Sequence, residues 1–155
     1  LALGGASWSR LGSDGAWVPL LEARGIAVAP LKPANCGFEM AWSPFLRERH
    51  AGQPLKAVTA LFTDTTGTTH RRSGELMVSD YGIEGSLVYA LSAPLRDAIL
   101  AQGSATLLLD LLPGHEAQRV ADEVAHPRGS RSLTSHLQSR LGLKGLKLAL
   151  LREVL

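Results

Sequence analysis

Residues 55–79, LKAVTALFTDTTGTTHRRSGELMVS, predict a β-hairpin, and this hairpin decides the fold class. Apolar residues dominate 55–62, a composition typical of a largely buried strand. The polar run 63–69 contains a glycine, which can adopt the positive φ of a hairpin turn. The return strand is predicted at about 70–79. Gly74 inside that strand indicates a bulge or a close approach of another backbone.

Further strands and helices surround the hairpin. Short apolar runs predict strands at 26–29, 38–42 and 105–112. A helix is predicted from Asp14 or Gly15 to Arg24, and a helical stretch at 86–102 is expected to be split by Pro94 and to end at Gly103. After the last strand the pattern is helical throughout, with helices predicted at 115–125, 130–141 and 143–155. The mixture predicts an α+β fold.

The composition is that of a globular protein. Of the 155 residues, 45% are hydrophobic and 19% are charged, which argues against intrinsic disorder. The longest apolar runs, 105–112 and 146–151, are well short of the roughly 20 residues that span a bilayer. A single cysteine, Cys36, excludes a disulfide framework and a Cys-rich zinc site within the chain. No two histidines are spaced as H-x-x-x-H. We therefore expect no membrane span, no metal site and a cytoplasmic location.

The two ends of the sequence suggest a piece cut from a longer protein. The sequence starts with LALGG, which resembles the end of a buried strand that runs into a glycine turn. Residues 143–155 form an amphipathic pattern that stops without a Gly, Asn or Pro terminator. We expect that segments outside the chain complete its function.

The first candidate site is the glycine-rich loop GGASWSRLGSDG at 4–15. A strand end followed by such a loop and a helix exposes backbone N–H groups where a cofactor could approach. The spacing is not that of a dinucleotide fingerprint, so a purely structural turn is the alternative. Asp14 has two readings in the same way, as a helix N-cap or as a ligand of a flavin or ribose.

The second candidate site is the segment SGELMVSDYGIEGS at 73–86, which brings Asp80, Tyr81 and Glu84 to a glycine turn at a helix start. Two carboxylates at such a place could serve acid–base chemistry. Because no matching base or nucleophile accompanies them, capping and tight packing are the favoured interpretation.

Charge is distributed unevenly along the chain. Residues 127–155 contain six Lys and Arg residues and one acidic residue. Residues 1–126 contain ten Lys and Arg residues and thirteen acidic residues. These basic helices suggest an alternative function, a free-standing α+β module that binds nucleic acid or another anionic partner. No aromatic residue follows Tyr89, so a base-stacking surface is missing there, and nucleic acid is not the expected partner.

Four groups of residues, in order along the chain, carry a resemblance to a known family. LALGGASW with LGSDG and LKPA resembles the second glycine motif of bacterial flavoproteins that contain an inserted domain. GQPLK at 52–56, GELM with YGIEG at 74–85, and LDLLP at 109–113 resemble that insert. The chain is thus similar to the FAD-dependent oxidoreductases that include aminoacetone oxidase. Its glycine loop is also similar to that of the fumarate reductase flavoproteins.

The resemblance implies a division of the chain into three parts. Residues 1–30 would form the edge of a Rossmann-like FAD-binding domain. Residues 31–113 would form a small Greek-key-like β-barrel insert with short helices around 86–102, and 114–155 a helical subdomain. The partner of the chain would then be the rest of the FAD-binding domain.

The resemblance also implies a cofactor and the residues near it. Gly4 and Gly5 would approach FAD through their backbone, with Gly12, Asp14 and Gly15 near the cofactor on the following loop. The loop departs from the serine- and threonine-rich sequence of many members. FAD would be bound by the whole protein, NAD(P) is a candidate second cofactor, and the insert would cover the active site or shape access for a small-molecule substrate. The chain is not expected to be catalytic alone, and no catalytic residue is assigned.

Overall fold

A computed structural model describes residues 3–154 of the chain. The chain divides into two compact units, Leu1–Ala34 and Asn35–Leu155. The strand end expected at the start of the sequence lies partly outside the described residues, and residues 3–5 form no strand. The division into domains at 1–30, 31–113 and 114–155 stays a prediction.

The first unit contains a short 3-10 helix, η1 (Ser9–Leu11), and one α-helix, α1 (Trp17–Glu22). The α-helix is shorter than predicted at both ends, and Pro19 lies in its first turn, where the missing N–H is tolerated. The strand predicted at 26–29 is wrong, because residues 26–33 have no regular secondary structure. A strand needs a hydrogen-bonded partner, and within the described part of this unit none pairs with this segment.

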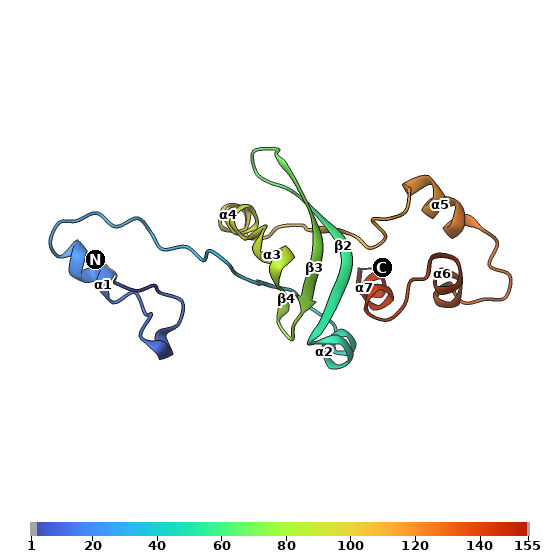
Figure 1. Ribbon diagram of the computed structural model, residues 1–155, viewed down its shortest axis with the longest axis horizontal. Helices are drawn as coiled ribbons and strands as arrows, with labels where there is room; N and C mark the ends of the chain where they lie inside the picture. Colours follow the sequence, from blue (N-terminus) through green and yellow to red (C-terminus); the bar gives the residue numbers. More distant parts are fainter. Residues whose placement is uncertain (1–2, 155) are drawn as a thin grey trace. The chain divides into compact units, whose positions relative to one another are not determined.

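The second unit is built on a five-stranded antiparallel sheet (Figure 1). The strands are β1 (Phe38–Glu39), β2 (Gln53–Thr63), β3 (Thr69–Val78), β4 (Gly82–Glu84) and β5 (Leu108–Asp110), in the order β1-β4-β3-β2-β5. β2 and β3 form the predicted hairpin. The predicted α+β class is confirmed, and the sheet with its helices is consistent with a barrel plus a helical domain.

The predicted strand 105–112 is shortened to β5, and 38–42 to β1. β5 pairs with β2 at Thr59–Leu61 only, and β1 pairs with two residues of β4. β1 and β5 are the two edge strands, and each pairs with a single neighbouring strand. The apolar residues on either side of these short pairings form no strand hydrogen bonds.

The irregularity expected at Gly74 lies instead on the opposite strand. Leu55 pairs with Leu76 while Val58 pairs with Gly74, so β2 carries an extra residue at this point. Ala57, inside the bulge, has φ of +51°, an uncommon conformation for a residue with a side chain. The Ala57 carbonyl accepts a hydrogen bond from the Lys147 ammonium (3.1 Å), which also donates to the Leu111 carbonyl (2.6 Å).

Six helices complete the second unit: α2 (Pro44–His50), α3 (Ser86–Tyr89), α4 (Ser92–Gln102), α5 (Ala117–Ala125), α6 (Leu133–Leu141) and α7 (Leu146–Val154). The break between α3 and α4 lies at Ala90–Leu91 rather than at Pro94. Pro94 occupies the first turn of α4, where its lack of an N–H leaves no bond unmade. Gly103 ends α4, as predicted. Within residues 3–154 no helix combines the length and the apolar character needed to cross a membrane.

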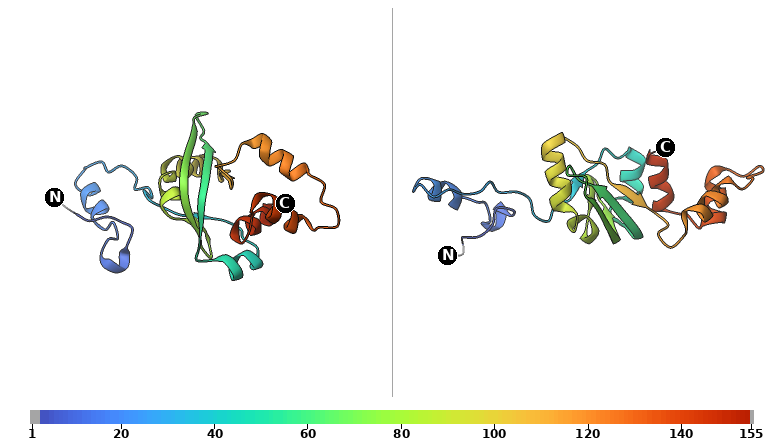
Figure 2. Two further views of the ribbon diagram at one scale, coloured as in Figure 1. Left: turned by 45° about the vertical axis from the view of Figure 1, so that its right-hand side comes forward. Right: turned by 90° about the horizontal axis from the view of Figure 1, so that it is seen from above.

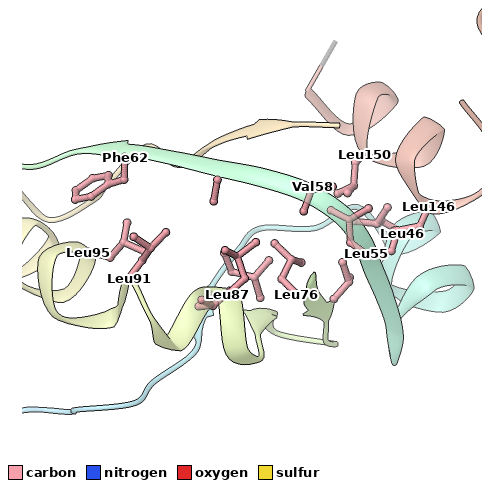
Figure 3. Close-up of a cluster of buried hydrophobic side chains, with 14 of the residues drawn as sticks. Leu46, Leu55, Val58, Phe62, Leu76, Leu87, Leu91, Leu95, Leu146 and Leu150 are labelled. Atoms are coloured by element: carbon pink, nitrogen blue, oxygen red, sulfur yellow. The ribbon is translucent and has the colours of Figure 1, made fainter. Parts of the chain in front are cut away.

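The helices lie on both sides of the hairpin. Viewed from above, the sheet lies between α4 and the pair α2 and α7 (Figure 2). The main core joins apolar residues of β2 and β3 to α3 and α4, and at its other end to α2 and α7 (Figure 3). Leu46 of α2 is fully buried there, in one cluster with Leu55, Leu146 and Leu150. A smaller cluster of Leu137, Leu141 and Leu143 packs against Val120 of α5 and against Leu148 and Leu151 of α7.

Candidate functional site

The glycine-rich loop of the first unit is closed by main-chain hydrogen bonds. The Gly15 N–H donates to the Gly5 carbonyl (3.1 Å), which brings the two ends of the loop together. A Cβ on Gly15 would lie 3.0 Å from the Ala6 Cβ, so only glycine allows this closure without a shift. At Gly4 and Gly12, by contrast, φ is about +80° and a Cβ would meet nothing within 4 Å. Bare backbone therefore faces open space at these two positions.

Asp14 is not the N-cap of α1, because Ala16 holds that position and no side chain caps it. The Asp14 Oδ1 accepts a hydrogen bond from the Ala16 N–H (3.0 Å), just before α1 begins. The indole Nε1 of Trp17, at the start of α1, is buried and has no hydrogen-bond partner among the described residues. A buried donor without an acceptor costs about 1–3 kcal/mol.

The turn at 79–86 serves packing. Ser79 and Gly82 exchange main-chain hydrogen bonds, and the Gly82 carbonyl also accepts from the Trp42 indole (3.1 Å). The side chain of Tyr81 is 78% exposed. Within residues 3–154 the side chains of Asp80 and Glu84 form no hydrogen bond or ion pair that joins them to a base or a nucleophile. The arrangement is that of the favoured alternative, a tight turn between β3 and β4.

A polar cluster at the tip of the β2–β3 hairpin was not foreseen from the sequence. Asp64 Oδ1 accepts hydrogen bonds from the N–H groups of Thr66 (2.9 Å) and Thr68 (3.1 Å) and from the Thr66 hydroxyl. His70 Nε2 lies 2.8 Å from the other carboxylate oxygen, Oδ2. The Thr66 hydroxyl, His70 and the two N–H groups together hold the pKa of Asp64 well below its usual range. The detectable signal was an aspartate at the start of a threonine-rich turn.

We expect Asp64→Asn to lower stability at neutral pH and to do so less as the solution becomes acidic. The ionised carboxylate is favoured in the folded state, so its contribution is complete above the ordinary aspartate pKa of about 3.9 and is lost as pH falls below it. Thermal unfolding of both proteins at about pH 7 and about pH 3 measures the difference. Asp122→Asn, on the exposed face of α5, is the control. A destabilisation independent of pH would contradict the ionic role.

The described residues of the second unit enclose two cavities of a size to hold a small molecule. One, of about 490 Å³, lies between the hairpin tip and the end of α4, where Asp64, Gln102 and Ser104 contribute to its wall. The other, of about 630 Å³, lies among α5, α6 and α7 and is mostly apolar. No group of three or more His, Cys, Asp or Glu side chains gathers to hold a metal within the described residues 3–154.

The second unit matches a known protein family almost throughout. Residues 32–154 match the family described as "HI0933-like protein barrel and H2TH domain". The chain belongs to this HI0933-like family. Its members are FAD-dependent oxidoreductases, so the resemblance found in the sequence is confirmed. The barrel and the H2TH domain of the family's description correspond to the sheet and the helices described above.

A curated relative of this HI0933-like chain is the 3-dehydro-bile acid delta(4,6)-reductase of Clostridium scindens, which is 27% identical over 120 residues. The aligned region covers 77% of the chain and 29% of the reductase, so the chain spans well under half of that protein's length. The family match begins at residue 32 and therefore does not include the glycine loop. Contact of Gly4, Gly5, Gly12, Asp14 and Gly15 with a cofactor stays a prediction.

Proposed function

We propose that this chain is the insert region of an FAD-dependent oxidoreductase, together with the adjoining edge of its FAD-binding domain. The observation that carries the proposal is the family match over residues 32–154. The relative named as a reductase supports a redox reaction on an organic small molecule, with NAD(P) as a candidate electron source. We place the whole protein in the cytoplasm, with the rest of the FAD-binding domain as the partner of this chain.

The residues of the glycine loop fit the edge of a flavin site. Gly4 and Gly12 leave the backbone uncovered, which is what a close approach of a cofactor would need. When FAD is bound, the flavin carries the electron transfer. The chain's own residues would hold the cofactor through backbone contacts and keep water from it, while Asp14 closes the turn that leads into α1.

Nucleic acid is not among the proposed partners. Four of the six basic residues in 127–155 are engaged within the fold, among them Arg131, which donates to the Ser139 hydroxyl (3.4 Å). Lys147 donates to two carbonyls, Arg140 forms an ion pair with Glu123, and Arg152 donates to the Thr134 hydroxyl. The basic character of the helices therefore serves in large part to fasten them to their neighbours.

The proposal is tested by the flavin content of the complete protein. Gly4→Val is expected to lower bound flavin roughly tenfold or more, because a side chain would occupy the space that the bare backbone leaves for the cofactor. Visible absorbance of the purified protein measures the bound flavin.

Gly25→Val is the matched control. Gly25 also lies in the first unit and has φ of +73° against +78° at Gly4, and a Cβ there would likewise meet nothing within 4 Å. Both variants therefore carry similar backbone strain, and only the one at Gly4 should lose flavin. A wild-type protein that holds no flavin and takes none up would overturn the proposed function, and equal losses in both variants would remove Gly4 from the site.

A further inference from the structure

We infer that α7 is a latch that opens as one body, and that its opening releases the start of α2 and the bulge of β2 together. Contacts at both ends of the helix carry the inference. It goes beyond the flavin assignment and does not depend on it.

The C-terminal end of α7 completes the cap of α2. Glu153 accepts hydrogen bonds from the main-chain N–H and, at 2.8 Å, from the hydroxyl of Ser43, the N-cap residue of α2. The Ser43 hydroxyl oxygen in turn accepts the Leu46 N–H (3.2 Å). In a capping box, a Glu or Gln at the third position of the same helix accepts the N-cap N–H. Leu46 occupies that position here and is buried in the core, so Glu153 supplies the acceptor from another helix.

The helix α2 depends on α7 for its stability. It has seven residues, whereas an isolated helix shorter than about 12–15 residues is marginal in water. Its support comes from the cap at Ser43 and from the burial of Leu46 in one cluster with Leu146 and Leu150 of α7 (Figure 3). Departure of α7 would remove the cap and uncover Leu46 at once.

The N-terminal end of α7 holds the bulge of β2. The Lys147 ammonium, in the first turn of the helix, donates to the Ala57 carbonyl (3.1 Å) and to the Leu111 carbonyl (2.6 Å). A hydrogen bond from a charged donor is stronger than one between neutral groups. It therefore offsets part of the cost of the positive φ of Ala57, +51°, which is unfavourable for a residue with a side chain. The bulge is expected to lose this support when α7 leaves.

Between these two ends, α7 lies at the rim of the main core. Leu146, Ala149 and Leu150 keep 7–9% of their surface exposed, whereas Leu55 and Val58 of the same cluster are at most 1% exposed. Proteins open locally in cooperative units, and a unit at the rim of a core opens at a lower cost than the whole fold. The helix α7 can thus leave while the β2–β3 hairpin stays folded.

The other contacts of α7 are with the helical side of the unit. Leu148 and Leu151 pack against the smaller cluster, and Arg152 donates to the Thr134 hydroxyl of α6. These contacts do not involve α2 or β2. They therefore need not break when α7 leaves those two elements, and they keep α7 attached to α6 as it moves.

Hydrogen exchange of the complete protein, followed by mass spectrometry of peptides from α2 and from residues 53–58, tests the latch. Glu153→Ala should raise exchange roughly tenfold in both peptides, although the Glu153 hydrogen bonds go to Ser43, at the start of α2. Glu153→Gln keeps an acceptor for the Ser43 N–H and should retain most of the protection. Glu48→Ala is the matched control, because Glu48 is exposed on α2 and forms no hydrogen bond or ion pair within residues 3–154. It should exchange as the wild type does.

Lys147→Met removes the ammonium, keeps a side chain of similar length and gives the reciprocal test. It should raise exchange in α2 as well as in the bulge, although the Lys147 hydrogen bonds go to Ala57 and Leu111. Peptides from the paired part of the hairpin, residues 59–63 and 69–74, report on global unfolding and should stay protected in every variant. Exchange that stays at the wild-type level in Glu153→Ala and Lys147→Met, that rises only beside the substituted residue, or that rises equally in the hairpin would overturn the proposal.

Discussion

Gly82→Ala is expected to destabilise the protein by about 4 kcal/mol or more, a loss reserved for substitutions that break the backbone arrangement. A Cβ at this position would lie 2.0 Å from the Phe38 carbonyl oxygen, 2.8 Å from the Met40 nitrogen and 2.9 Å from the Glu39 Cα. All three atoms are main chain, so no side chain can rotate away. β4 would have to separate from β1, and the Gly82 carbonyl would lose its bonds from Ser79 and Trp42.

Gly103→Ala is the matched control for this prediction. Gly103 also has a positive φ, +82°, at the end of α4, but a Cβ there would meet nothing within 4 Å. Gly103→Ala should lower the free energy of unfolding by about 1–2 kcal/mol, the cost of a left-handed backbone conformation for a residue with a side chain. Urea unfolding of the complete protein measures both variants. Equal losses would show that the close approach of β1 to β4 contributes nothing.

Leu46→Ala is expected to cost about 2–5 kcal/mol, the range for a fully buried leucine that leaves a cavity. Leu46 is 0% exposed and lies where α2, β2 and α7 meet, in one cluster with Leu55 and Leu150 (Figure 3). Each of these elements is anchored by other contacts, so the space left by the side chain should not close fully. The free energy of unfolding in urea and the protease sensitivity of α7 measure the effect.

The neighbouring Phe45 supplies the control for Leu46. It has the larger side chain and lies on the same helix, but it is 52% exposed. Phe45→Ala should therefore cost less than about 1 kcal/mol, as surface substitutions generally do. If the exposed phenylalanine proved the more costly of the two, the helix α2 would not dock on the core through Leu46.

The hairpin could be predicted from the sequence because its signals are local. The apolar run of β2, the threonine-rich turn and the return strand follow one another, so pairing needs no distant segment. The predictions were wrong where the structure depends on a partner strand or on the register between two strands. The apolar residues at 26–29 have strand composition but no strand beside them in the described part of the chain, and the bulge at Ala57 depends on the register with β3 rather than on Gly74.

The candidate sites show the same limit. Asp14 was predicted to cap a helix, but it closes a turn onto the Ala16 N–H two residues later, just before α1. The Asp64 and His70 pair was not foreseen, because it forms only when the hairpin register brings the two across the turn. The cavity among α5, α6 and α7 could not be foreseen either, since it depends on how these helices pack in space. A local turn can be predicted from residue type and position, whereas a cavity depends on how segments distant in the sequence pack together.

The contact between α2 and α7 has a consequence for how the chain folds during synthesis. Glu153 accepts hydrogen bonds from the main-chain N–H and the hydroxyl of Ser43, 110 residues earlier, at the N-terminal end of α2. On the ribosome, α2 and the hairpin emerge long before their last partner, so the end of the core near Leu46 stays uncovered while the intervening residues are made. Contacts of such long sequence separation slow folding, because loop closure precedes the gain from burial. The nascent chain is thus expected to be a chaperone client until α7 has been translated.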